Sequence, residues 1–308
     1  GYHQKIGEAH AEVNAINNVL LHFGEAAPAL LKNATAYVSL EPCAHFGKTP
    51  PCADLLVKHQ LKKVVIGNTD PFSEVNGKGI EKLRTAGIAV ETGILEKECS
   101  YLNRRFFTRI KQQRPFIILK WAQTADGFFA PADDSQKWIS GALAKQYTHL
   151  WRTEEDAILV GKQTALVDNP QLTARNVEGK NPVRLIIDKN LAIPSTHHIY
   201  NNEAKTIIFN EVKTDVIDNI HFVQMEDMQF YLAQKIAFQL YLMDIQSVII
   251  EGGAQILNQF IKAGLWDEAR VFTAKTVWEK GIKAPQIIGN VIEHLQIGDD
   301  ELTITQHT

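Results

Sequence analysis

The chain has 308 residues, of which 45% are hydrophobic and 22% are charged, as is ordinary for a globular protein with full-sized cores. Its formal net charge of −3 gives no global electrostatic basis for binding nucleic acid or an anionic membrane. No apolar run approaches the roughly 20 residues that span a bilayer. The 3 cysteines form no disulfide framework, which favours a reducing, cytoplasmic setting.

Helix and strand patterns alternate in the first third of the chain. Apolar residues at helical spacing predict a helix from His10, and a short apolar run ended by Pro42 predicts a buried strand. A second helix is expected to hold its prolines in the first turn, where a missing N–H costs nothing. The order helix, strand, helix, strand, helix, strand covers residues 10–23, 35–41, 49–60, 62–68, 79–87 and 88–94. Such alternation predicts a mostly parallel sheet.

A basic, polar segment at Asn103–Pro115 has no strand pattern and predicts a domain boundary near residue 112. A second α/β pattern starts after it, so we expect two α/β domains, residues 1–112 and 113–308. Strands are predicted over residues 116–122, 157–161, 183–188, 205–209, 221–225 and 247–253, with helices near 142–152 and 230–243.

A histidine and two cysteines in the first domain have the residue types of a catalytic zinc site. His10, Cys43 and Cys52 would supply one imidazole and two thiolates, which leaves the fourth position of the tetrahedron for water. Glu12 is too close to His10 to share its helical face as a ligand, but it could reach that water and shuttle a proton to a departing amine. H-x-E followed by P-C-x-x-C is the known signature of zinc deaminases. The alternative is a helix-start histidine, a surface acid and two buried cysteines.

The loop between the two cysteines is longer than in the short signature, with eight residues separating Cys43 from Cys52. Its sequence, EPCAHFGKTPPC, resembles that of the bifunctional riboflavin-biosynthesis deaminase/reductase family, and the resemblance covers nearly the whole chain. It implies an N-terminal cytidine-deaminase-like α/β/α domain that acts on a ribosylated diaminopyrimidinone 5′-phosphate. It also implies that His45 and Lys48 help to hold this substrate.

Members of that family begin with a helix and strands that carry an NPxVGAV segment, which does not occur here. The first elements of the deaminase domain are therefore expected to be missing. One alternative follows, in which the chain is a reductase only and its truncated deaminase half is not catalytic.

In the second domain no G-x-G-x-x-G follows a predicted strand, so the usual dinucleotide fingerprint is absent. The segment VIIEGGAQILNQF, Val248–Phe260, instead joins a buried strand to an amphipathic helix through Glu-Gly-Gly. Glycines at such a turn let main-chain N–H groups approach an anion at the helix N-terminus, although a structural tight turn would use them equally well.

Four segments of the second domain occur in the order seen in the reductase half of the same family: LKWAQTADG, SQKWIS, ILVGKQTALVDNPQLTAR and EGG. The resemblance implies a dihydrofolate-reductase-like α/β fold that uses NADPH. It places at the cofactor Ala122, Trp138, Thr164, Asp168, Gly253, Ala254, Gln255, Ile256, Leu257, Asn258 and Gln259. On the substrate side it places Arg152, Leu172, Arg175 and Glu251, whereas Gln136 replaces a serine and stays unassigned.

The residue chemistry fits this assignment, because guanidinium groups bind phosphate through two parallel hydrogen bonds. For each arginine a surface ion pair is the alternative, and Trp138 could be a core residue. We therefore predict a cytoplasmic enzyme that holds one Zn²⁺ and uses NADPH. It would deaminate the pyrimidine by hydrolysis and then reduce the ribosyl to a ribityl side chain.

A zinc-containing RNA-binding or RNA-editing protein is the alternative from another class. The net charge of −3 argues against it, so neither a nucleic-acid partner nor a membrane is expected. The sequence leaves the oligomeric state open, a homo-oligomer included.

Overall fold

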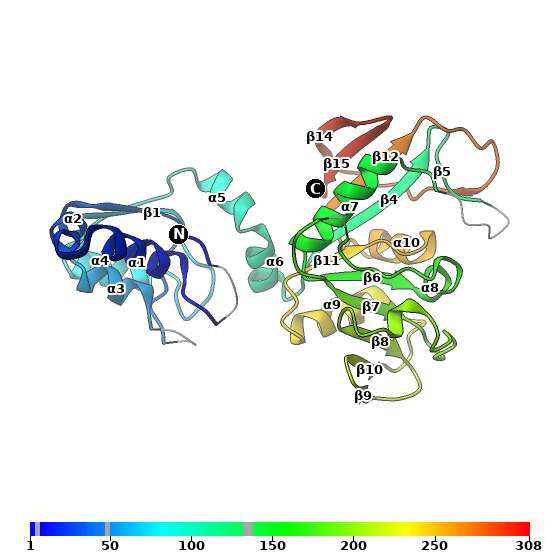
Figure 1. Cartoon of the computed structure of the whole chain (residues 1–308), viewed down its shortest axis with the longest axis horizontal. Helices are drawn as coiled ribbons and strands as arrows, with labels where there is room; N and C mark the ends of the chain where they lie inside the picture. Colours follow the sequence, from blue (N-terminus) through cyan, green and yellow to red (C-terminus); the bar gives the residue numbers. More distant parts are fainter. Residues whose placement is uncertain (4–6, 47–49, 132–137, 176) are drawn as a thin grey trace. The chain divides into compact units, whose positions relative to one another are not determined.

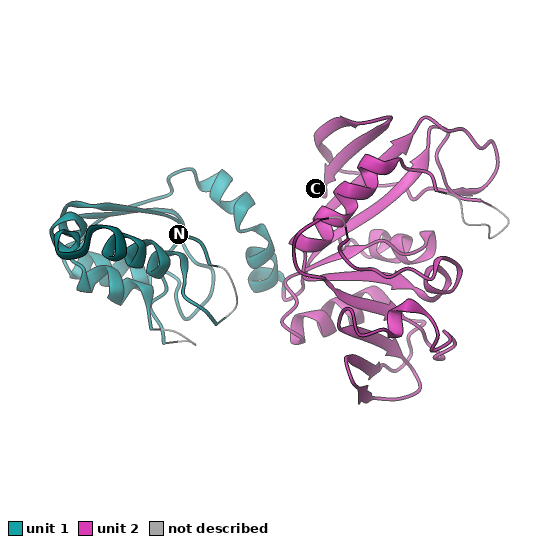
Figure 2. Cartoon of the chain, in the orientation of Figure 1, with its two compact units in different colours: residues 1–112 teal, residues 113–308 magenta. Residues whose placement is uncertain are grey.

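The computed structural model describes residues 1–3, 7–46, 50–131, 138–175 and 177–308. They divide into two compact units, Gly1–Gln112 and Gln113–Thr308, which have separate colours in Figure 2. Within the described ranges, no helix combines the length and the apolar character needed to cross a lipid bilayer. Each unit has its own sheet and its own buried apolar cluster.

The first unit is built on a parallel sheet of three strands in the order β1-β2-β3. Helices lie before, between and after the strands, as α/β alternation requires (Figure 1). In chain order the elements are α1 (Ala11–Phe23), a 3-10 turn (Gly24–Ala26), α2 (Ala27–Asn33), β1 (Thr35–Leu40), α3 (Cys52–Lys58), β2 (Lys63–Asn68), α4 (Lys78–Thr85), β3 (Ala89–Thr92), α5 (Glu96–Leu102) and α6 (Arg104–Gln112).

The core of the first unit forms around the middle strand, β2. Val64 and Ile66 share one face of this strand and are fully buried. They pack against Ile16 of α1, Leu56 of α3 and Leu83 of α4. Since these helices are fixed by apolar contacts, the residues at their first turns have defined positions relative to the ends of the strands.

The second unit contains a sheet of ten strands in the order β14-β15-β12-β4-β11-β6-β7-β8-β10-β9. The run from β12 to β10 is parallel, whereas β14, β15 and β9 pair antiparallel. The strands of this unit are β4 (Phe116–Thr124), β5 (Phe128–Ala130), β6 (Ala157–Gly161), β7 (Val183–Ile187), β8 (Thr206–Asn210), β9 (Asp215–Ile217), β10 (Ile220–Gln224), β11 (Ser247–Ile250), β12 (Glu268–Ala274), β13 (Ile282–Lys283), β14 (Asn290–Ile297) and β15 (Asp300–Gln306). Strands β5 and β13 lie outside the ten-stranded sheet and pair with each other. The helices are α7 (Ala142–Glu154), α8 (Lys162–Asp168), a 3-10 turn (His198–Tyr200), α9 (Leu232–Leu242) and α10 (Ala254–Lys262).

Strand β4 shows why the second sheet is covered on both faces. Ile117 and Leu119 belong to a cluster with residues of α9 and α10, whereas Phe116 and Ile118 belong to one with residues of α7. Four consecutive apolar residues, 116–119, fit a parallel sheet between two layers of helices.

Two features differ from the prediction. The segment predicted to hold the domain boundary contains α6, which is compatible with its lack of a strand pattern. The prolines do not lie in the first turn of α3, because this helix begins at Cys52 and Pro51, at the N-cap, has an extended ψ of 134°. Strands β12 to β15 were not predicted from their mixed polar and apolar pattern.

Candidate active sites

His10, Cys43 and Cys52 converge in the first unit although they are far apart in the sequence. His10 is the N-cap residue of α1, Cys52 is the first residue of α3, and Cys43 follows β1. Their three potential ligand atoms all lie within 4.8 Å of one another. His10 Nδ1 is 3.6 Å from the Cys43 sulfur and 3.4 Å from the Cys52 sulfur.

These distances fit a tetrahedral zinc ion. Zinc binds sulfur at about 2.3 Å and imidazole nitrogen at about 2.0–2.1 Å, which sets a nitrogen-to-sulfur separation of about 3.6 Å across a tetrahedral angle. The Cys43 sulfur also accepts the main-chain N–H of Cys52 at 3.2 Å. Hydrogen bonding to Cys52 lowers the pKa of Cys43, with a further contribution from His10, whereas the same hydrogen bond and burial raise the pKa of Cys52. Without a metal ion, the thiolate is therefore favoured at Cys43 and opposed at Cys52.

Glu12 lies in the first turn of α1, beside this cluster. Burial raises the pKa of its carboxyl group, and the charge of Cys43 acts in the same direction. The carboxylate is close enough to interact with both cysteines and with His10. A carboxyl with a raised pKa, next to a metal site and outside its ligand set, is suited to accept and return a proton.

Glu41 is a buried residue of this site that the sequence reasoning did not select. Its two carboxylate oxygens accept N–H groups from Asp70, Gly77, Gly79 and Ile80 at 2.9 to 3.2 Å. The start of α4 is therefore tied to the loop that carries Cys43. A Cβ atom at Gly79 would lie 2.1 Å from the Pro42 carbonyl oxygen, so only glycine allows this approach.

Of the two residues expected to hold the substrate of this unit, His45 belongs to the described part of the chain. The His45 ring lies 5.7 Å from that of Phe72, and its Nδ1 atom is buried without a hydrogen-bond partner in the described part of the chain. Its ring and Cys43 both interact with Asp70, whose pKa is raised chiefly by burial. Lys48 lies outside the described residues.

In the second unit, the Glu-Gly-Gly turn lies directly against the end of β6. A Cβ atom at Gly252 would be 2.5 Å from the nitrogen of Gly161 and from Cα of Val160. Gly253 has a φ of +34°, and its N–H donates to the Thr164 hydroxyl oxygen at 3.0 Å. Two of the residues assigned to the cofactor are thus in contact, and both glycines are required by the backbone.

The residues of α10 contribute to this site in different ways. Ile256 and Leu257 are buried in the core, whereas the side chain of Gln255 is exposed. Only the first-turn N–H groups of a helix lack a partner within it. The main chain at Ala254 and Gln255 can therefore face an anion, while Asn258 and Gln259, in the second turn, can take part only through their half-buried side chains.

The other residues assigned to the cofactor are spread over three places. Ala122 is half-buried in β4, and Asp168 is the exposed last residue of α8. Trp138 is 70% exposed, so it is not a core residue, and the ammonium group of Lys145 lies 3.9 Å from its ring centre. Gln136 lies outside the described residues.

On the substrate side, an ion pair joins α7 to the end of β11. A guanidinium nitrogen of Arg152 lies 2.8 Å from a carboxylate oxygen of Glu251, and only about a tenth of each side chain is exposed. Burial raises the pKa of Glu251, but the charges of Arg152 and Lys120 outweigh it and hold the pKa below its ordinary value. Lys120 was not selected from the sequence; burial lowers its pKa.

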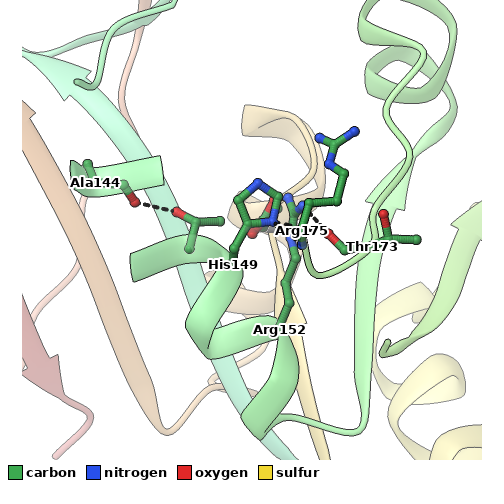
Figure 3. Close-up of polar contacts among 7 residues, drawn as sticks. Ala144, His149, Arg152, Thr173 and Arg175 are labelled. Carbon is green, nitrogen blue, oxygen red and sulfur yellow. Dashed lines mark hydrogen bonds and ion pairs between the residues drawn. The ribbon is translucent and has the colours of Figure 1, made fainter. Parts of the chain in front are cut away.

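The segment that carries Thr173 and Arg175 lies beside Arg152 of this ion pair (Figure 3). Leu172 is buried and has a φ of +55°, in the left-handed region that leucine rarely adopts. The Arg175 side chain is exposed and hydrogen-bonds to the side chain of Gln171, while its main-chain N–H donates to Nδ1 of His149 at 3.1 Å. His149 also was not selected from the sequence.

Two family models match the chain. The description "Cytidine and deoxycytidylate deaminase zinc-binding region" matches residues 1–68, and "RibD C-terminal domain" matches residues 115–278. A riboflavin biosynthesis protein RibD from Aquifex aeolicus is 39% identical over 302 residues, which cover 96% of this chain and 83% of the relative. The chain belongs to the RibD family.

Solved structures of RibD proteins agree with this assignment. Acinetobacter baumannii RibD has a TM-score of 0.89 and 32% identity, covering 100% of this chain and 88% of its own. The deaminase/reductase from Thermotoga maritima has a TM-score of 0.87 and 33% identity, with the same coverage. The resemblance and the α/β class predicted from the sequence are confirmed.

RibD membership also decides between the interpretations left open by the sequence. Both a deaminase zinc-binding region and a reductase domain are matched, so this RibD protein is a bifunctional enzyme of riboflavin biosynthesis. Its cofactors are Zn²⁺ and NADPH. The two alternatives, a reductase with a non-catalytic first half and an RNA-binding zinc protein, are not supported.

The first prediction concerns zinc. The purified chain is expected to hold about one zinc ion, and Cys43→Ser is expected to release it, because a hydroxyl is a poor zinc ligand at neutral pH. Elemental analysis after dialysis measures the content. Cys99→Ser, which changes the cysteine outside the cluster, should keep the metal. Equal zinc in the two variants would contradict the ligand set.

The second prediction concerns Glu41. Glu41→Gln places an amide group where a carboxylate accepts four main-chain N–H groups, so we expect the first unit to lose about 1–3 kcal/mol of stability. Hydrogen exchange of the Gly77, Gly79 and Ile80 amides should accelerate accordingly. Glu81→Gln, at an exposed position of α4, is the matched control and should leave exchange unchanged. Unchanged exchange in both variants would show that the Glu41 contacts are not stabilising.

The third prediction concerns the turn before α10. Gly253→Val adds a branched side chain at a positive φ, next to the N–H groups that would face the cofactor phosphates, and should weaken NADPH binding at least about tenfold. Fluorescence titration with NADPH measures this. Gly264→Ala, just beyond the other end of α10 and also at a positive φ, should lower stability without changing NADPH affinity. Unchanged affinity in folded Gly253→Val would place the cofactor elsewhere.

Proposed function

We propose that residues 1–112 deaminate a ribosylated diaminopyrimidinone 5′-phosphate by hydrolysis, and that residues 113–308 then reduce its ribosyl group to ribityl. The observation that carries the proposal is the convergence of His10, Cys43 and Cys52 at zinc-ligand distances in a unit separate from the Glu-Gly-Gly turn. The Thermotoga maritima relative is titled a diaminohydroxyphosphoribosylaminopyrimidine deaminase and 5-amino-6-(5-phosphoribosylamino)uracil reductase, which supports these substrates for this chain.

In the first unit, His10, Cys43 and Cys52 hold the zinc and Glu12 handles the proton. Bound zinc would lower the pKa of a water to about 7 and so supply a hydroxide for the ring carbon that carries the amine. Glu12 would accept a proton from that water and pass it to the exocyclic amine, which would leave as ammonia while the new C–O bond becomes a carbonyl. Burial raises the pKa of Glu12, which favours uptake of a proton by its carboxylate.

Binding of the substrate in the first unit is assigned to His45 and Lys48. The Nδ1 atom of His45 is buried and has no partner among the described residues, so a ligand can hydrogen-bond to it. Lys48 would add a positive charge for the phosphate, as its place in the HFGKTPP loop suggests.

In the second unit, the first turn of α10 would hold the phosphates of NADPH. Main-chain N–H groups at Ala254 and Gln255 and the positive end of the helix dipole favour anions there. NADPH held there would supply the hydride for reduction at C1′ of the opened, imine-like form of the sugar, with a proton from solvent going to the nitrogen. Ala122, Trp138, Thr164 and Asp168 would orient the cofactor.

The two arginines of the second unit have different roles in this proposal. The guanidinium of Arg152 is paired with Glu251, so the pair orients the sugar instead of binding its phosphate. Arg175 is exposed and presents its guanidinium to solvent, where a phosphate can form two parallel hydrogen bonds with it. The side chain of Leu172 is buried and anchors the segment that leads to Arg175. Because that side chain lies in the core, Leu172 would contact substrate through its main-chain groups.

The proposal also covers the setting of the enzyme. A small phosphorylated substrate requires neither nucleic acid nor a membrane, and the free cysteines suit a reducing cytoplasm, where thiolate ligands stay reduced. The oligomeric state is left open.

The fourth prediction separates the two activities. Glu12→Ala is expected to lower the rate of ammonia release by about 10²–10⁴, because a general acid–base group is lost. Zinc content should not change, since Glu12 is not a ligand. NADPH oxidation with previously deaminated substrate should also be unchanged.

A matched control is Glu8→Ala, which removes an exposed acid from the segment before α1. It should retain both activities. Loss of NADPH oxidation in a folded Glu12→Ala variant would contradict the assignment of the two reactions to two sites.

A further inference from the structure

The segment that presents Arg175 is attached to α7 by two side chains one helical turn apart. His149 and Arg152 are three residues apart and therefore share a face of the helix (Figure 3). Arg152 donates to the Thr173 carbonyl oxygen at 3.1 Å. Nδ1 of His149 lies 3.1 Å from the Arg175 nitrogen and 3.2 Å from the same carbonyl oxygen.

These contacts select one tautomer of His149. An imidazole nitrogen cannot accept one hydrogen bond and donate another at the same time. The Thr173 carbonyl already has Arg152 as a donor, whereas Nδ1 of His149 is the acceptor for the Arg175 N–H. With its proton on Nε2, the neutral ring satisfies the Arg175 N–H and leaves the carbonyl to Arg152.

The segment needs such contacts because its backbone is not in a relaxed conformation. Leu172 has a φ of +55°, in the left-handed region, and is almost fully buried. Conformations of this kind persist only where surrounding contacts hold them, and they are frequent at ligand sites. The direction in which the next residues leave Leu172 therefore depends on their attachment to α7.

The surroundings of His149 oppose its protonation. Burial is the main cause that lowers its pKa, and the positive charges of Arg152 on its own helix and of Arg175 on the attached segment add to it. The Thr173 carbonyl and the Glu251 carboxylate, from β11, act in the opposite direction without cancelling the effect. The ring is thus neutral at neutral pH, as the hydrogen bond from Arg175 requires.

We propose that His149 is a positioning residue of the reductase, whose neutral ring fixes the main chain at Arg175 and so directs the guanidinium to the substrate phosphate. This rests on the proposed function of Arg175 as the phosphate anchor. Protonation would turn Nδ1 into a donor toward Thr173 and leave the Arg175 N–H without its acceptor. The contact is present above the lowered pKa of His149 and is lost as pH falls through it.

Steady-state kinetics of NADPH oxidation with the deaminated substrate test this, between pH 5.5 and pH 8. At pH 8, His149→Leu should raise KM about tenfold, because an acceptor that orders the segment is lost, with a smaller effect on kcat. His149→Asn can place an oxygen near the position of Nδ1, so it should restore most of the affinity. Since Asn does not titrate, its KM should also rise less at low pH than that of the unmodified chain.

Two further variants make the outcome specific. His221 lies on β10, which β7 and β8 separate from β6, and burial lowers the pKa of this histidine too. His221→Asn should therefore leave KM unchanged. Arg175→Ala should raise KM if the proposed phosphate anchor is right. If Arg175→Ala has no effect, both the proposed anchor and its positioning by His149 are overturned.

If Arg175→Ala raises KM but folded His149→Leu does not, only the positioning role of His149 is overturned. The protonation step is overturned if the pH dependence of KM in His149→Asn superimposes on that of the unmodified chain. The substrate phosphate titrates near pH 6, but it affects all variants alike and cancels in this comparison.

Discussion

Parallel pairing of β4, β11 and β6 brings the carboxyl ends of these strands to one edge of the second sheet. Ile250 is paired with Leu119 on one side and with Leu159 on the other, so the residues that follow them are neighbours. Glu251 consequently interacts with Lys120, and Gly252 meets the end of β6. Ligands in open α/β sheets bind at this edge, because the strand ends and the first turns of the following helices meet there.

The same constraint operates in the first unit. The strands β1 and β2 are parallel, with Leu40 paired to Asn68, and each is followed by a loop that contributes to the zinc cluster or its support. Glu41 directly follows β1, and its carboxylate binds the N–H groups of the loop after β2 and of the first turn of α4. The position of Cys43 thus depends on a buried acceptor two residues away, as is usual for the supports of metal ligands.

The parts of the sites that could be predicted from the sequence were short motifs with a chemical signature of their own. The cluster that we propose as the zinc site is an example, since the sequence motifs selected His10, Cys43 and Cys52 and the structure brings their ligand atoms within 4.8 Å of one another. Lys120 and His149 could not be predicted in this way. Their roles come from Glu251 and Arg175, which are distant in the sequence and become neighbours only through sheet register and the attachment of a strained segment to α7.

The central claim is that one chain carries out two reactions in sequence, the second on the product of the first. It is tested most directly by giving the zinc-loaded chain the diaminopyrimidinone phosphate and NADPH, and by following ammonia and NADPH in the same sample. Ammonia should appear first, and NADPH should then be oxidised in an equal molar amount. Oxidation of NADPH without release of ammonia would contradict the claim, because the second site would then act on a substrate that the first had not changed.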